Sequence, residues 1–123
     1  MRPEERDPAH LWDMLEAARA VVDFTESLTL EEFLAAGKDR QITRLAVERH
    51  LEIVGEAARR VSSPFRDEHA ENPWKETVGL RNIISYEYDK VNYTAIYRIV
   101  RERVPELIQF LEPLVPPPTP VEE

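Results

Sequence analysis

The sequence predicts an all-α bundle of four main helices and one short helix, and three observations support this fold class. Apolar residues recur at steps of three and four along the long segments, which is the period of an amphipathic helix. Charged residues make up 33% of the chain and glycine occupies only 3 positions, a balance typical of long exposed helices. The length of 123 residues suits one domain. The predicted helices cover residues 7–27, 29–37, 39–62, 73–85 and 93–114.

Local signals fix where the first two helices are expected to begin and end. Asp7 is expected as N-cap and Pro8 as the first helical residue, where the missing N–H of proline costs nothing. Thr29 and Glu32 have the spacing of a capping box, so a short helix follows. Gly37 is expected to end that helix.

The third helix combines small residues with a row of acids. Gly55, Ala57 and Ala58 would let another helix approach closely. Glu48, Glu52 and Glu56 lie four residues apart and so share a face. A solvated face is the simpler interpretation of these acids, and an arginine partner or a basic patch of another subunit is the alternative.

The second half of the chain is punctuated by proline. Residues 63–73 are expected to form a loop, with Asn72 as the cap and Pro73 as the first residue of the next helix. Pro105 lies within the last helix and should kink or divide it, because it removes a backbone hydrogen bond. The bundle is expected to span residues 1–113, and the proline-rich residues 114–123 to be a disordered tail.

Composition excludes several kinds of site and favours a soluble, cytoplasmic protein. There is no cysteine, so disulfides and thiolate metal sites are excluded. No apolar run has the length of a membrane span, so no membrane association is expected. The net charge of -8 argues against sequence-independent binding of nucleic acid. Residues 74–104 nevertheless carry a local balance of +2, so any surface that binds anions is expected there.

Isolated histidines and aromatic residues predict little chemistry. His10, His50 and His69 lack the companions that a metal site needs, so each is interpreted as a surface or packing residue and no metal or cofactor is expected. The aromatic side chains are spread over separate helices and are interpreted as core or dimer residues: Trp12, Phe24, Phe33, Trp74 and Phe110.

The stretch "GLRNIISYEYDKVNY", residues 79–93, is the strongest candidate site. Arg81 and Asn82 lie five and four residues before Tyr86, and Tyr88 follows two residues later. A guanidinium there could hold a phosphate through two hydrogen bonds, with Asn82 orienting it. Helix-end arginines are often structural, so the residues alone leave a helical module without any site as an alternative.

This stretch resembles the R-N-x-x-x-H-x-Y motif of the HepT-like (DUF86) family of the HEPN superfamily. The likeness extends from about residue 10 to residue 112, through "LWDMLEAARAVVDFTESLTLEEFLA" and "AVERHLEIVGEAARRVS". The resemblance implies an up-and-down HEPN bundle that forms a homodimer, in which two copies of the motif face one cleft. It also implies a toxin that cleaves RNA without a metal.

The resemblance further implies a partner and a role for each motif residue. An MNT-type nucleotidyltransferase antitoxin would silence the toxin by AMPylation of its motif tyrosine. Arg81 would bind phosphate and stabilise the transition state, and Asn82 would be its orienting neighbour. Tyr88 would accept AMP.

The motif departs from the family at its catalytic histidine, because Tyr86 occupies that position. A phenol with a pKa of about 10 is a poor base at pH 7, and losing such a step costs about 10²- to 10⁴-fold in rate. Tyr86 is then either natural, in a member that has become a binding module for a nucleotidyltransferase, or an inactivating substitution. The second interpretation is favoured because the rest of the motif is intact.

Overall fold

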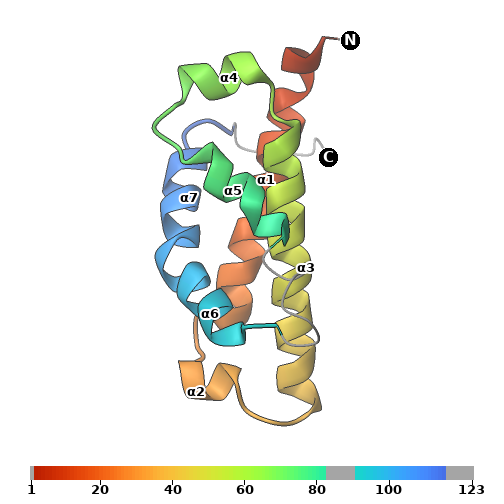
Figure 1. The fold of residues 1–123 in the computed structure, drawn as a ribbon, viewed down its shortest axis with the longest axis vertical. Coiled ribbons are helices and arrows are strands. Elements are labelled where there is room, and N and C mark those ends of the chain that lie inside the picture. Colours follow the sequence, from red (N-terminus) through yellow and green to blue (C-terminus); the bar gives the residue numbers. More distant parts are fainter. Residues whose placement is uncertain (1, 83–90, 116–123) are drawn as a thin grey trace, which may run out of the picture.

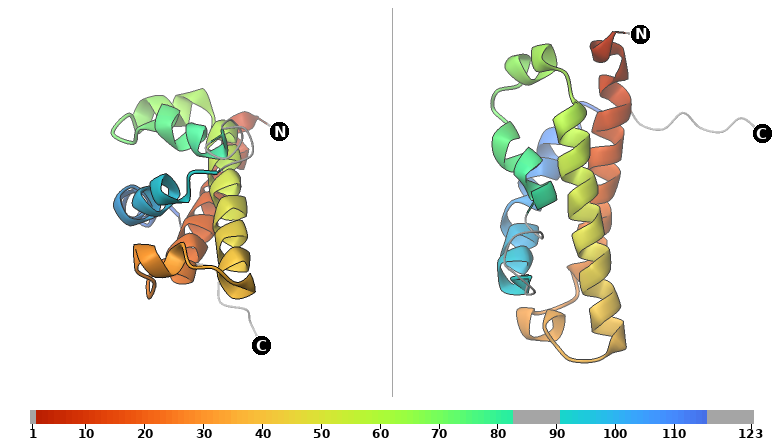
Figure 2. Two further views of the ribbon diagram at one scale, coloured as in Figure 1. Left: turned by 60° about the horizontal axis from the view of Figure 1, so that its bottom comes forward. Right: turned by 45° about the vertical axis from the view of Figure 1, so that its right-hand side comes forward.

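Two long antiparallel helices, α1 (Pro3–Thr25) and α3 (Lys38–Arg60), lie side by side along the length of the molecule (Figures 1 and 2). The structure is a computed structural model that describes residues 2–82 and 91–115. The other elements are α2 (Leu30–Phe33), α4 (Ser63–Glu68), α5 (Trp74–Gly79), the 3₁₀ helix η1 (Leu80–Asn82), α6 (Tyr93–Glu102) and α7 (Val104–Leu111). These two stretches contain no strand, so the predicted all-α fold is confirmed.

The remaining helices cover one side of the α1–α3 pair. In Figure 2, α5, α6 and α7 lie together on one side of the two long helices. α7 packs on α1, whereas α5 and η1 pack on α3. One broad side of the α1–α3 pair therefore faces the core, and both helices contribute to the opposite side.

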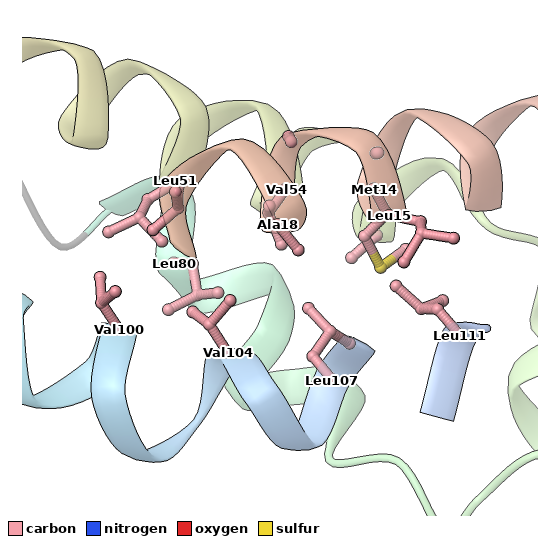
Figure 3. Packing of buried hydrophobic residues seen from close by; sticks show 14 of the residues in the cluster. Met14, Leu15, Ala18, Leu51, Val54, Leu80, Val100, Val104, Leu107 and Leu111 are labelled. Atoms are coloured by element: carbon pink, nitrogen blue, oxygen red, sulfur yellow. The ribbon is translucent and has the colours of Figure 1, made fainter. Parts of the chain in front are cut away.

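The core lies where these layers meet (Figure 3). Met14 and Ala18 from α1 and Val54 from α3 are completely buried. Figure 3 shows them facing residues of η1, α6 and α7, among them Leu80 and Leu111. Burying such side chains stabilises the fold by about 1.5–3 kcal/mol for each large one.

The first helix begins earlier than the sequence predicted. α1 starts at Pro3, and Pro8 lies inside it. Proline at the start of a helix and acids in its first turn, here Glu4 and Glu5, are both favourable because the first N–H groups have no partner there. Asp7 is therefore not an N-cap. Its buried carboxylate instead accepts hydrogen bonds from the backbone N–H and hydroxyl of Ser62, at 2.8 and 2.6 Å.

The capping box of the short helix is confirmed. The Thr29 hydroxyl accepts a hydrogen bond from the Glu32 N–H, and the Glu32 carboxylate accepts one from the Thr29 N–H. The hydrogen bond from the Thr29 N–H to the carboxylate is the main cause of the lowered pKa of Glu32. Gly37 does not end this helix, which stops at Phe33. With φ at 116°, Gly37 is instead the N-cap of α3, in a conformation that favours glycine.

The prediction of a loop over residues 63–73 is wrong, because residues 63–68 form α4. Ser62 caps this helix by accepting a hydrogen bond from the Phe65 N–H at 3.3 Å, and proline lies in its first turn. Arg66 donates to the carbonyls of Val61 and Ala58, which ties α4 to the end of α3.

The predicted helix over residues 73–85 is also divided. Pro73 is the N-cap of α5 rather than its first residue, and the buried side chain of Asn72 does not cap it. α5 ends at Gly79, and the 3₁₀ helix η1 follows it directly and carries Arg81. Glycine destabilises a helix interior by about 1 kcal/mol relative to alanine, which favours a break at this point.

The prediction for Pro105 is confirmed. α6 ends at Glu102 and α7 begins at Val104, so the proline lies in the first turn of a new helix, where no N–H is needed. α6 itself begins at an Asn92 cap, whose side chain accepts a hydrogen bond from the Ala95 N–H at 3.0 Å.

No helix in the described part of the chain is long and apolar enough to span a membrane.

Candidate functional site

The described half of the motif lies on η1. Arg81 is half-buried and Asn82 is exposed on this short turn. Tyr86 and Tyr88 lie outside the described residues. The described part of the site therefore consists of Arg81, Asn82 and the side chains that surround them.

Gly55 is the residue that lets η1 come close to α3. A Cβ built on Gly55 would lie 2.4 Å from the Arg81 backbone nitrogen and 2.9 Å from the Val78 carbonyl oxygen. Real Cβ atoms do not make such contacts, so only glycine fits. The expectation that small residues of this helix allow a close approach is confirmed at Gly55, and it fixes the Arg81 backbone against α3.

An ion pair with α3 orients the Arg81 side chain. Arg81 Nη1 lies 2.8 Å from Glu56 Oε2, and Arg59 Nη2 lies 3.1 Å from Glu56 Oε1. The hydrogen bonds from Arg59 and then Arg81 lower the pKa of Glu56 to about 2. Glu56 is therefore ionised at neutral pH and holds the guanidinium in one place.

Arg81 and Asn82 line a hollow of about 450 Å³ between α1, α3 and η1. This volume falls in the range of about 300–1,000 Å³ found for ligand pockets. The wall is rich in charged side chains from segments far apart in the sequence: His10, Asp13, Arg49, Glu52, Ile53, Glu56, Ala57, Arg60, Arg81 and Asn82. Three arginines and three acidic side chains thus share one polar hollow.

The three histidines have different environments. His50 Nδ1 lies 2.8 Å from the Ala46 carbonyl oxygen, and its ring packs edge-on against Phe24. His69 lies against Phe65, with ring centroids 4.2 Å apart. The structural interpretation of these two is confirmed. His10 instead lines the hollow beside the motif arginine, which the sequence did not predict.

The three glutamates of α3 do not form a common solvated face. Glu48 is buried and accepts a hydrogen bond from the Tyr93 hydroxyl at 2.6 Å. Burial, together with this hydrogen bond, raises the pKa of Tyr93 to about 12. Glu52 lies 3.9 Å from Arg49, and Glu56 binds Arg81. The simpler interpretation of these acids was therefore wrong at Glu48, and the arginine partner of Glu56 comes from its own chain.

Several other basic residues hold the bundle together and are not available to a ligand. Arg44 donates to the Phe33 and Ala35 carbonyls. Arg101 donates to the Thr25 carbonyl at 2.7 Å and lies over the ring of Tyr97. The Tyr97 hydroxyl donates to the Leu28 carbonyl, so Tyr93 and Tyr97 both pack within the bundle.

The predicted basic region over residues 74–104 contributes only part of the candidate site. Of its basic residues in the described structure, Arg81 alone lines the hollow, whereas Arg103 pairs with Glu76 at the surface at 3.1 Å. Arg49 and Arg60 come from α3. Within the described ranges no group of histidine and acidic side chains could hold a metal ion.

A second hollow of about 460 Å³ lies between α5, α6 and α7. Its wall is mainly apolar and includes Leu80, Val104, Leu107 and Phe110. Its arginine, Arg103, pairs with Glu76. Neither Arg81 nor Asn82 lines this second hollow, so the hollow beside Arg81 is the candidate site.

Comparison with known proteins agrees with the motif. The family model "Ribonuclease HepT-like" matches residues 14–114. The chain is 40% identical over 104 residues to "Putative RNase MJ1380" of Methanocaldococcus jannaschii, an alignment that covers 85% of this chain and 92% of that protein. It is 34% identical over 98 residues to "Probable ribonuclease HepT" of Thermococcus cleftensis, which covers 80% of this chain and 86% of that protein.

No solved structure matches the chain at a significant level. The family model nevertheless spans most of the helical bundle, and it includes Arg81 and Asn82 as well as the part of α3 that holds them. The chain therefore belongs to the ribonuclease HepT-like family.

Proposed function

We propose that this protein is an endoribonuclease by descent, in which the hollow beside Arg81 binds a phosphate of the RNA backbone. The observation that carries this proposal is the position of Arg81, which shares the hollow with Arg49 and Arg60. A phosphodiester in the hollow could accept hydrogen bonds from more than one guanidinium. The overall charge of -8 then matters little, because binding depends on a local arrangement.

Arg81 would supply electrostatic stabilisation rather than acid–base chemistry. Negative charge builds up on the phosphate oxygens as the ribose 2′-oxygen attacks, and a donor held in place stabilises that charge without reorganisation. Glu56 holds Arg81 through one of its terminal nitrogens. An arginine has five N–H donors, so this ion pair is compatible with binding of a phosphate. Asn82 would orient the same phosphate.

We further propose that the protein acts as a toxin in the cytoplasm and is controlled by a nucleotidyltransferase antitoxin. The partner would transfer AMP to Tyr88, and two copies of this chain would form a homodimer around one cleft. The family and the spacing of Arg81, Asn82 and Tyr88 support this arrangement. No metal or cofactor is needed for it, because attack by the 2′-oxygen requires only proton transfer and charge stabilisation.

Arg81→Ala is expected to lower RNA cleavage by about 10²- to 10³-fold, because it removes a donor to the transition-state charge. The measurement is the cleavage rate of a labelled RNA oligonucleotide by the purified full chain. Arg103→Ala is the matched control, since Arg103 is exposed and pairs with Glu76 outside this hollow. Equal rates for Arg81→Ala and the unmodified chain would refute the assignment of Arg81.

The tyrosine at position 86 favours a second function, a non-catalytic module that docks a nucleotidyltransferase and receives AMP on Tyr88. Incubation with the partner and ATP is then expected to add one AMP to the chain, seen as a mass increase that Tyr88→Phe abolishes. Modification without any RNA cleavage, even after Tyr86→His, would favour this module over the ribonuclease. An unmodified Tyr88 would count against both the module and the proposed antitoxin.

A further inference from the structure

We propose that His10 moves the catalytic proton in this chain, in the role that Tyr86 at the motif position cannot fill. This inference rests on the proposed ribonuclease function. The basis of this proposal is geometric. His10 lies on the first half of α1 and lines the same hollow as Arg81, although Arg81 follows it by more than 70 residues in the sequence. The fold thus brings an imidazole to the motif arginine from another helix.

His10 differs from the other two histidines in having no structural role in the described residues. The ring nitrogens of His50 and His69 lie near the Ala46 carbonyl and the Glu71 carboxylate, respectively, and both rings pack against aromatic neighbours. The His10 ring has no hydrogen bond, ion pair or ring contact within residues 2–82 and 91–115. It is half-buried, so a ligand in the hollow can reach it.

The charges around His10 are balanced between opposing signs. The charged groups that share its hollow are Asp13 from α1, Arg49, Glu52, Glu56 and Arg60 from α3, and Arg81 from η1. Glu56 is engaged by Arg59 and Arg81, so it is a poor competitor for a proton. Imidazole is the side chain most often used for general acid–base catalysis.

The proposed step is attack of the ribose 2′-oxygen on the adjacent phosphorus. His10 takes the proton from the 2′-hydroxyl as the new P–O bond forms and the bond to the 5′-oxygen breaks. Water supplies the proton that the leaving 5′-oxygen requires. The products are a 2′,3′-cyclic phosphate and a 5′-hydroxyl end, so no oxidant, metal or cofactor enters the balance.

The test compares His10→Gln with the unmodified full chain on a labelled single-stranded RNA. His10→Gln is expected to lower kcat by about 10²-fold or more with a smaller change in KM, because general base catalysis contributes about 10²- to 10⁴-fold. The limb of the pH–rate profile that reports an imidazole should disappear. Free imidazole should partly restore cleavage by His10→Ala, which a purely structural role would not allow.

His50→Gln is the matched control, because His50 is also half-buried on a long helix and lies outside the hollow. It should leave the rate and the pH profile unchanged, and thermal unfolding shows whether each variant is folded. An unchanged rate for His10→Gln would overturn the role of His10 while leaving the ribonuclease function intact. Absence of cleavage by the unmodified chain, with strong cleavage by Tyr86→His, would also overturn it. Absence of cleavage by both proteins would instead refute the ribonuclease function itself.

Discussion

Tyr86→His is expected to raise the rate of RNA cleavage by about 10²- to 10⁴-fold, because it places an imidazole where the HepT-like motif has its histidine. That imidazole can give the leaving 5′-oxygen the proton that water supplies in the unmodified chain. A phenol, with a pKa of about 10, is a weaker acid for this step. The measurement is kcat for cleavage of a labelled RNA, together with growth arrest on expression. The gain should appear mainly in kcat, since proton transfer belongs to the transition state.

Tyr86→Phe is the matched control for this substitution. It keeps the ring and removes the hydroxyl, so it should leave the low rate of the unmodified chain unchanged. A loss of activity in Tyr86→Phe would show that the phenol itself takes part in catalysis. No gain from Tyr86→His in either the cleavage assay or the growth assay would contradict the toxin interpretation.

Gly55→Ala is expected to destabilise the protein and to damage the site. The new Cβ would lie 2.4 Å from the Arg81 backbone nitrogen, so η1 must move away from α3. Overpacking of this kind costs about 1–3 kcal/mol, which outweighs the gain of about 1 kcal/mol from replacing a helical glycine with alanine. Thermal unfolding measures the change in stability.

Gly79→Ala provides a control of the opposite sign. A Cβ on Gly79, the last residue of α5, meets no atom of the described residues within 4 Å, so alanine should be neutral or stabilising by up to about 1 kcal/mol. In the Tyr86→His background, Gly55→Ala should also lower cleavage, because a shift of about 1 Å in a catalytic group costs about 10²-fold. Equal stability of the two alanine variants would contradict the close packing of η1 on α3.

Local signals predicted most of the helices because capping and proline act over a few residues. The Thr29–Glu32 capping box and the division at Pro105 appear as expected. The errors arose where two local signals competed. Asp7 and Pro8 look like a helix start, but Pro3 begins α1 earlier, and the Asp7 carboxylate is used by Ser62, 55 residues away.

The prediction of a loop at residues 63–73 missed a signal that was present. Ser62 followed closely by Pro64 is a helix start, but the polar composition of the segment concealed it. The helix predicted to carry Arg81 ends at Gly79, so the arginine lies on a 3₁₀ turn. That turn is held by contact with Gly55, and no local rule along residues 73–85 predicts a contact with another helix.

The candidate site could be predicted only in part because its wall comes from three distant segments. Spacing and resemblance identified Arg81 and Asn82, which line the hollow. His10 was interpreted as a surface or packing residue, since nothing near it in the sequence suggests a partner. Glu56 was noticed as one of three acids, but its pairing with Arg81 depends on how η1 packs on α3. Tertiary contacts of this kind are absent from a linear pattern.

The most direct test of the ribonuclease assignment compares Tyr86→His with the double variant Tyr86→His/Arg81→Ala on one RNA substrate. The site described here predicts strong cleavage by the single variant, without added metal and with a 2′,3′-cyclic phosphate end. It predicts a loss of about 10²- to 10³-fold in the double variant. Cleavage that is absent from both, or equal in both, would contradict the claim that the hollow beside Arg81 is a ribonuclease site.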